Sequence, residues 1–195
     1  TQPVSNHDVE RWAGLNGKPA ALLTFLDGVS LRRPEASHCA QDGKALAKLH
    51  RAGSDFSGGR QNALGPEGWR KLAAETQTNA DTVQAGLALL IQSTIGELDA
   101  WPSGLPSGII HADLFPDNVL FLNGEISGLI DFYFACNDAY AYDLAVMLNA
   151  WCFETDGSFN ITKGTALLSG YSQNRELSNA EIDALPLLAQ GAALR

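Results

Sequence analysis

The chain has 195 residues, 45% of them hydrophobic and 18% charged, which suits one domain or one large lobe of a bigger enzyme with a substantial apolar core. Its formal net charge of −9 argues against a nucleic-acid partner, because a protein that binds a phosphate backbone needs an excess of Lys and Arg. The sequence contains no apolar run of about 18 residues, the length that would predict a membrane span. Its first residues also lack the pattern of a signal peptide. The three cysteines lack paired spacing, so we expect reduced thiols in a cytoplasmic protein without a membrane partner.

The first fifty residues predict a pair of strands followed by a helix. The apolar run Ala20–Leu26, which ends at Asp27-Gly28, is typical of a buried strand and a turn. Residues 4–12 are a candidate partner strand, joined to it through residues 14–17. Apolar side chains at helical spacing predict a helix over residues 38–50.

The middle of the chain is predicted to be mostly helical. Residues 53–65 are rich in Gly, Ser and Asn, which indicates a loop. Residues 66–96 follow with a long, mostly helical pattern. Residues 101–108 contain two prolines and are expected to form a linker.

Beyond that linker the pattern changes to short strands around a polar loop. Ile109-Ile110 and Val119–Leu122 are strand-like runs, and Asn123-Gly124 is a strong signal for a hairpin turn. Residues 125–132 complete the hairpin, and residues 140–151 predict a helix. We therefore expect an α+β fold that is mainly helical, with one small β-hairpin that presents polar residues at its edges.

Five polar residues stand between apolar runs in and after this hairpin: His111, Asp113, Asn118, Asp131 and Asp143. Exposed loops seldom show this pattern, and a core seldom tolerates three carboxylates without partners. A divalent metal ion and phosphate oxygens would compensate such a set of charges.

The same residue types suit the transfer of a phosphoryl group to a hydroxyl. Asp113 is placed to accept the proton of the hydroxyl and to orient its oxygen. Asn118 and Asp131 offer hard oxygen ligands for Mg²⁺ from opposite arms of the hairpin. The ring of His111 is expected to bind the backbone or Asp131 and to stiffen the loop. Asp143 has a plainer interpretation as well, because Asp is a good N-cap residue for the helix that follows.

The spacing His-x-Asp-x-x-x-x-Asn, followed by Ile-Asp-Phe and Tyr-Asp-Leu-Ala, resembles the aminoglycoside phosphotransferase and choline kinase family. That family shares its fold with the eukaryotic protein kinases. Three longer segments, NALGPEGWR, HADLFPDNVLF and LIDFYFACNDAYAYDLAVMLNAWCFE, are similar to its bacterial homoserine kinase branch. The resemblance implies an enzyme that uses ATP and Mg²⁺ to phosphorylate L-homoserine to O-phospho-L-homoserine in threonine biosynthesis.

The resemblance also implies a role for each polar residue of the motif. Asp113 becomes the catalytic base, and Asn118 and Asp131 become the Mg²⁺ ligands. His111 and Asp143 support the catalytic loop.

The nucleotide site follows from the same resemblance. Residues 24–28 resemble the hinge between the two lobes of a kinase, whose backbone binds adenine near Phe25, Leu26 and Asp27. Leu120 and Ile130 are expected to form the floor of the adenine pocket. The sequence does not distinguish ATP from GTP as the phosphoryl donor, because a hinge recognises the nucleotide base largely through its backbone.

The expected domain organisation is that of a kinase C-terminal lobe. Residues 1–28 would be the end of the N-terminal lobe and the hinge, and residues 29–195 the helical C-terminal lobe. The chain opens without Met, has no Gly-rich phosphate loop, and has Lys18 in a turn instead of a strand lysine. We therefore expect most of the N-terminal lobe to precede Thr1, and this chain alone to bind ATP weakly and to turn over little.

The substrate site is less constrained by the sequence. Arg60 and Asn62 lie in a flexible loop, where they either contact substrate or are solvated, and Asn137 and Asp138 are candidates to line the pocket. Homoserine would need a carboxylate for its ammonium group and an arginine or backbone N–H groups for its carboxylate. Alternatives are an aminoglycoside, choline or another amino alcohol as acceptor, or a non-catalytic kinase-like fragment. The sequence leaves the oligomeric state open.

Overall fold

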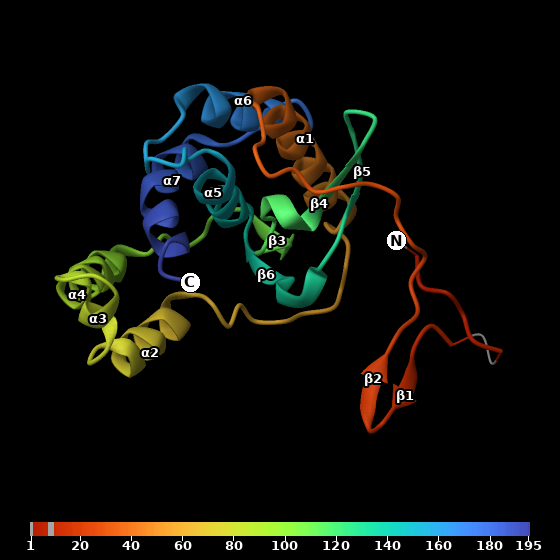
Figure 1. Cartoon of the computed structure of the whole chain (residues 1–195), viewed down its shortest axis with the longest axis horizontal. Coiled ribbons are helices and arrows are strands. Elements are labelled where there is room, and N and C mark those ends of the chain that lie inside the picture. The colour runs from red at the N-terminus through yellow and green to blue at the C-terminus, as the bar shows by residue number, and fades with distance from the viewer. Residues whose placement is uncertain (1, 8–9) are drawn as a thin grey trace.

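The chain folds mainly into helices, with three small two-stranded antiparallel sheets in the part that the structure, a computed structural model, describes. The described residues are 2–7 and 10–195. The helices are α1 (Ala36–Ala52), α2 (Pro66–Thr76), α3 (Ala80–Val83), α4 (Leu87–Glu97), α5 (Tyr140–Trp151), α6 (Ile161–Ser172) and α7 (Asn179–Ala192). The strands are β1 (Ala13–Leu15), β2 (Lys18–Ala20), β3 (Ser107–Ile110), β4 (Val119–Leu122), β5 (Glu125–Leu129) and β6 (Cys136–Ala139) (Figure 1). Short 3₁₀ turns are η1 (Leu98–Ala100), η2 (Pro116–Asn118) and η3 (Phe132–Phe134).

This architecture confirms the predicted mainly helical α+β class and the helices at 38–50 and 140–151. The long helical stretch 66–96 is divided into three helices. The last of them begins after Gly86, whose φ of 84° lies in the left-handed region. The structure does not test the boundary at residue 28, which remains a prediction.

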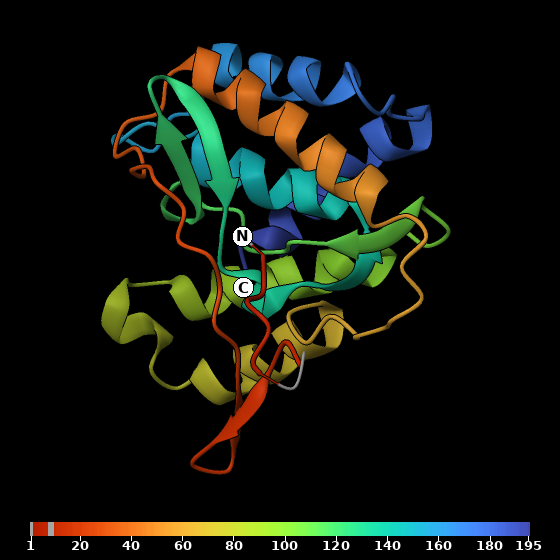
Figure 2. The same cartoon turned by 90° about the vertical axis from the view of Figure 1, so that its right-hand side faces the viewer.

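The N-terminal hairpin differs from the prediction. Asn16 and Gly17 have φ angles of 51° and 76°, which are typical of the tight turn that joins β1 to β2. The predicted buried strand at 20–26 is wrong, because β2 ends at Ala20 and residues 21–25 beyond it are exposed, such as Phe25, which is 89% exposed. Figures 1 and 2 show the hairpin projecting away from the helices.

The segment that pairs with residues 22–24 also differs from the predicted partner strand 4–12. Val4 N–H donates to the Leu22 carbonyl at 2.8 Å, and Thr24 N–H donates to the Gln2 carbonyl at 3.0 Å. The pairing segment therefore includes residues 2–4. The predicted strand 4–12 also contains residues 8 and 9, which lie outside the described residues.

The helical core is built around α5, which is buried on all sides over residues 140–148. Figure 2 shows α1 and α6 running side by side next to α5. Two glycines allow α1 and α6 to touch: a Cβ on Gly43 would lie 2.1 Å from the Leu167 carbonyl oxygen, and one on Gly170 would lie 2.0 Å from that of Ala40. Cys39, Cys136 and Cys152 are buried and form no disulfide, as the sequence predicted. No helix in the described ranges combines the length and the apolarity needed to cross a membrane.

One carboxylate in this core has no partner among the described residues. Asp42, on α1, is fully buried, and neither oxygen of its side chain receives a hydrogen bond. Burial and the neighbouring Cys39 raise the pKa of Asp42 to about 8, from an ordinary value of 3.8. The folded protein therefore holds a proton here that the unfolded chain releases above pH 4.

We expect Asp42→Asn to become progressively more stable than the original protein as the pH rises from 5 to 8. Unfolding releases the Asp42 proton in this range, so the free energy of unfolding of the original protein falls by up to about 1.4 kcal/mol per pH unit from this group. Asn has nearly the same shape and does not titrate. Urea unfolding at pH 5 and pH 8 measures the difference, with the exposed Asp183→Asn as the matched control. Equal pH dependence in both variants would contradict the prediction.

The second half of the chain carries the predicted hairpin. The turn between β4 and β5 is Asn123-Gly124, with φ angles of 52° and 83°, as expected. The strand predicted over 125–132 ends earlier, at Leu129, because Asp131 is left-handed and starts the η3 turn. β3 pairs with β6, so Ile109 lies opposite Asn137. This pairing brings the two segments that flank the hairpin together.

Candidate active site

The loop between β3 and β4 is held by one buried carboxylate. Asp143, in the first turns of α5, accepts the backbone N–H of His111 at 2.7 Å and that of Ala112 at 2.8 Å, one on each oxygen. The His50 Nε2 lies 3.0 Å from the same carboxylate. Asp143 thus clamps the loop rather than capping its helix, whose N-cap is Ala139.

The ionised form of Asp143 is favoured despite its burial. Burial alone would raise the pKa of this carboxyl, but the hydrogen bond and charge of His50 and the hydrogen bond from the His111 backbone lower it below its ordinary value of 3.8. Behind it, His50 Nδ1 lies 2.7 Å from the Tyr171 hydroxyl, which joins α1 and α6 to the network. The Asp143 carboxylate is therefore linked to α1 and α6 as well as to the loop between β3 and β4.

The clamp fixes an unfavourable backbone conformation immediately before Asp113. Ala112 has a φ of 58°, in the left-handed region that residues other than glycine and asparagine seldom adopt. Such strain persists where surrounding contacts determine it, and it is common at functional sites. Its effect here is to turn the chain so that the Asp113 side chain is only partly buried, with 20% of it exposed.

Asn118 lies against Asp113. Its Nδ2 donates to the Asp113 carbonyl at 2.7 Å and to the Asp113 Oδ2 at 3.3 Å. Because the amide nitrogen is used in this way, its oxygen is left for another ligand. The Ile130 N–H donates to the Asn118 carbonyl at 3.0 Å, which places Asp131 next to Asn118 in the hairpin.

Asp131 is exposed, and its φ of 60° is again left-handed. One of its oxygens accepts the Tyr133 N–H at 3.3 Å. Asp131 and Asn118 together supply a small set of hard oxygen donors, which fits Mg²⁺, an ion that keeps several waters and binds phosphate oxygens. Within residues 2–7 and 10–195 no three His, Cys, Asp or Glu side chains form a metal site by themselves, so the remaining ligands would come from nucleotide and water.

His111 has the supporting contacts that the sequence predicted. Its Nε2 lies 2.9 Å from the Ile130 carbonyl, and because a carbonyl oxygen only accepts, this nitrogen carries the proton. The ring lies 4.6 Å from that of Phe132 and is fully buried. His111 therefore links the catalytic loop to the end of the hairpin through the backbone, and not through Asp131.

Part of the segment expected to contact the nucleotide packs on the same hairpin. The chain at Val29 pairs with Phe121 of β4 through two hydrogen bonds of 2.9 Å. A Cβ on Gly128 would lie 2.3 Å from the Leu26 Cδ1, so Leu26 packs directly on β5. Leu120 and Ile130 are partly buried near this contact, whereas Phe25 and Asp27 are exposed.

The four candidate substrate residues come together as two bonded pairs. Arg60 N–H donates to the Asn137 side chain at 2.8 Å, and Asn62 Nδ2 donates to the Asp138 carboxylate at 2.7 Å. The guanidinium of Arg60 lies 5.6 Å from the centre of the Tyr133 ring and donates to the Tyr133 carbonyl. The loop 53–65 is thus attached to β6 and η3, beside the catalytic loop.

A family model described as the phosphotransferase enzyme family matches residues 3–177. The chain belongs to this phosphotransferase enzyme family. It is 60% identical over 194 residues to a homoserine kinase of Chelativorans sp. (strain BNC1), covering 99% of this chain and 60% of that protein. It is 58% identical over 194 residues to a homoserine kinase of Mesorhizobium japonicum, covering 99% of this chain and 61% of that protein. The chain therefore spans about three fifths of the length of these relatives.

Solved structures of other kinases share the fold of this chain. An aminoglycoside phosphotransferase from Alicyclobacillus acidocaldarius aligns with a TM-score of 0.73 at 16% identity, covering 97% of this chain and 63% of that one. An ethanolamine kinase from Plasmodium vivax aligns with a TM-score of 0.66 at 18% identity, covering 94% of this chain and 58% of that one. At these identities the likeness establishes the fold alone.

The structure adds residues to the phosphotransferase site that the sequence analysis missed. Arg195 pairs with Asp113 at 2.8 Å although the two residues lie 82 positions apart. His50, at the end of the helix predicted over residues 38–50, is buried against Asp143. No local spacing signals either contact. A Leu-His pair at the end of an amphipathic helix was the one available hint for His50.

Proposed function

We propose that the whole protein is a homoserine kinase, which transfers the γ-phosphoryl group of ATP to the hydroxyl of L-homoserine and forms O-phospho-L-homoserine for threonine biosynthesis in the cytoplasm. The observation that carries this proposal is the 60% identity, over 99% of the chain, to a protein named homoserine kinase. Membership of the phosphotransferase family supports the reaction class.

In the proposed reaction Asp113 receives the substrate hydroxyl. Its carboxylate orients the oxygen and takes the proton as the new O–P bond forms. Asp143, through the N–H groups of His111 and Ala112, holds the loop so that this carboxylate keeps its position. The Asn118 side chain donates one hydrogen bond to this carboxylate and one to the Asp113 backbone carbonyl.

Asn118 and Asp131 are the residues proposed to hold Mg²⁺, and Leu26, Leu120 and Ile130 those proposed to contact the nucleotide, together with the backbone of Phe25 and Asp27. When bound, Mg²⁺ supplies positive charge that neutralises the phosphate oxygens. The protein holds the acceptor hydroxyl close to the base, so its main contribution to the reaction is to position the reacting groups.

Release of ADP by the protein in its full natural length tests the proposal. We expect release with L-homoserine and little with choline or kanamycin, measured with a coupled enzyme assay that contains MgATP. Phosphohomoserine in the product mixture, identified by mass spectrometry, would support the proposed acceptor. ADP release with kanamycin or choline but not with homoserine would reject homoserine in favour of the alternatives, and no release with any alcohol would favour a non-catalytic kinase-like protein.

We expect Asp131→Asn to raise the Mg²⁺ concentration needed for half-maximal activity by about tenfold or more, and to lower turnover, because the neutral amide is a weaker ligand than a carboxylate. Titration of Mg²⁺ at fixed ATP measures the shift. Direct binding of MgATP, followed by calorimetry, should weaken as well. Asp183→Asn, an exposed substitution on α7, is the control. An unchanged Mg²⁺ dependence would remove Asp131 from the proposed ligands.

A further inference from the structure

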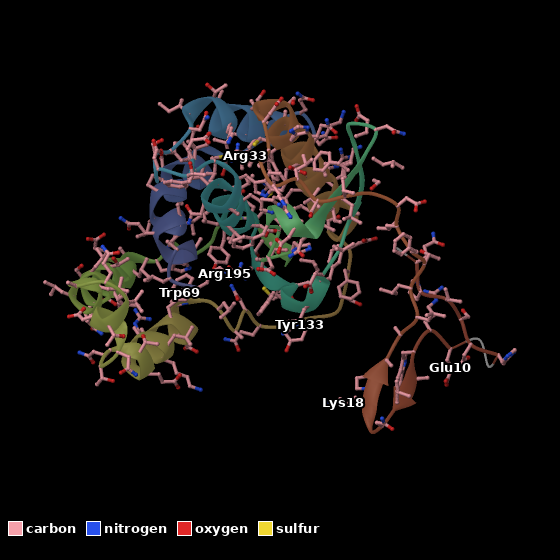
Figure 3. The ribbon with its side chains drawn as sticks, in the orientation of Figure 1. Glu10, Lys18, Arg33, Trp69, Tyr133 and Arg195 are labelled. Atoms are coloured by element: carbon pink, nitrogen blue, oxygen red, sulfur yellow. The ribbon has the colours of Figure 1, made fainter. Side chains whose placement is uncertain are left out.

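Arg195 occupies an unusual position for a charged side chain. Its Nη2 lies 2.8 Å from the Asp113 Oδ1, and its Nη1 donates to the Ala112 carbonyl. The side chain is 9% exposed, so this cation is largely removed from water beside the proposed base. In Figure 3 Arg195 lies between Trp69 and the turn that carries Tyr133.

Two aromatic rings fix the plane of the guanidinium. Its centre lies 5.7 Å from the ring of Phe115 and 5.5 Å from the ring of Phe134, distances typical of cation–π contacts. Phe115 belongs to the catalytic loop and Phe134 to η3. The charge is therefore held beside Asp113 by the loop between β3 and β4 and by η3.

The guanidinium has donors to spare. An arginine side chain carries five N–H donors in a fixed fork, and the two contacts to Asp113 and Ala112 use two of them. The remaining donors suit a second carboxylate, which a guanidinium binds with two parallel hydrogen bonds. Among the described residues, Arg195 is the one side chain that forms an ion pair with Asp113.

We infer, on the basis of the proposed function, that Arg195 binds the α-carboxylate of the acceptor and is the residue that selects an amino acid over a simple amino alcohol. The hydroxyl oxygen and the carboxylate carbon of homoserine are separated by about 5 Å when the molecule is extended. A cation 2.8 Å from the base that holds the hydroxyl is within reach of the other end of the same small molecule.

The contact with Asp113 then has a role before substrate binds. The Asp113 carboxylate pairs the buried cation before substrate binds. The substrate carboxylate then binds the remaining donors of the guanidinium, while the Asp113 Oδ2, which Arg195 does not contact, accepts the hydroxyl proton. One arginine thereby positions both the base and the acceptor.

Other candidate groups suit this role less well. Arg60 is exposed and already donates to the Tyr133 carbonyl. A cavity of about 480 Å³ between α2, α4 and α7 also borders Arg195, but its walls are mostly apolar.

The test compares two acceptors in the protein in its full natural length. L-homoserine and 3-aminopropan-1-ol present the same hydroxyl and amine, and the second lacks the carboxylate. We expect Arg195→Gln and Arg195→Ala to lower kcat/KM for homoserine by about 10- to 100-fold, mainly through a higher KM, as expected for the loss of a charge-assisted hydrogen-bonded pair. With 3-aminopropan-1-ol, which has no carboxylate for the guanidinium, the loss should be smaller by about fivefold or more.

Arg195→Lys should recover part of the lost preference, because it keeps the charge without the bidentate fork. It also covers the case in which the smaller side chains disturb folding, which thermal unfolding of each variant reports. Arg70→Ala is the matched control, since Arg70 forms an exposed pair with Asp99 and should leave kcat/KM for both acceptors unchanged.

Three outcomes would contradict either the role of Arg195 in selecting the acceptor or the proposed function. Equal losses with both acceptors would place Arg195 on the phosphoryl transfer itself and would overturn its role in selection. An unchanged preference for homoserine in all the Arg195 variants would do the same, while leaving the homoserine kinase proposal intact. No activity of the original protein on homoserine would overturn the proposed function itself.

Discussion

Replacing Asp113 with Asn is expected to lower kcat for homoserine phosphorylation by about 10²- to 10⁴-fold. The amide keeps the shape of the carboxylate but accepts no proton from the hydroxyl, so the chemical step loses its base. Its contacts with Asn118 and Arg195 involve Asp113 oxygens that a carboxamide reproduces in part. Nucleotide binding should therefore change little. Steady-state kinetics and calorimetry with MgATP measure the two effects separately.

The control for this variant is Asp183→Asn, which makes the same substitution on the exposed face of α7. It should retain the original kcat. A burst experiment with rapid mixing can show that the loss in Asp113→Asn lies in the chemical step and not in product release. An unchanged kcat in Asp113→Asn would remove Asp113 from the role of base.

Asp143→Asn is expected to destabilise the fold by about 3–5 kcal/mol and to reduce activity at the same time. The carboxylate accepts hydrogen bonds from two backbone N–H groups and from His50, whereas an amide turns at least one donor toward another donor. The left-handed Ala112 then loses the contacts that hold it. Urea unfolding measures the stability, and kcat measures the displacement of Asp113.

The effect of Asp143→Asn should depend on pH in a defined direction. The pKa of Asp143 is lower in the folded protein than its ordinary value of 3.8, so the stabilisation is complete above that value and is lost as the pH falls through the lower, native pKa. The difference in unfolding free energy between variant and original should thus be constant from pH 5 to 8 and should shrink below pH 4. A difference that grows on acidification would contradict the network described here, and Asp183→Asn again provides the exposed control.

Short-range features of the site were predictable from the sequence. Asp113, Asn118 and Asp131 lie within one loop and one hairpin, and Asn123-Gly124 determines where that hairpin turns. The turn sets the first pairs of the hairpin, but a register shift between Leu120 and Phe121, which the turn does not predict, brings the Ile130 N–H to the Asn118 carbonyl. The helix at 140–151 was equally clear, because its apolar residues cover every side.

The N-terminal segment shows where the sequence was insufficient. The run Ala20–Leu26 has the composition of a buried strand, but burial needs another element to cover it, and composition does not say whether one is there. The strands instead form on either side of Asn16-Gly17, whose turn geometry is local. A local turn could be predicted, whereas the environment of the apolar run could not.

The class of fold, the hairpin around Asn123-Gly124 and the polar residues proposed for phosphoryl transfer could be predicted from the sequence, because each depends on residues that are near in the chain. The distant groups around the proposed site are seen in the folded protein alone. Asp143 reaches back to the loop, His50 and Tyr171 support it from α1 and α6, and Arg195 meets Asp113. These contacts join separate helices, and their geometry is set by how α1, α5, α6 and α7 pack, which the spacing of residues along a chain does not encode.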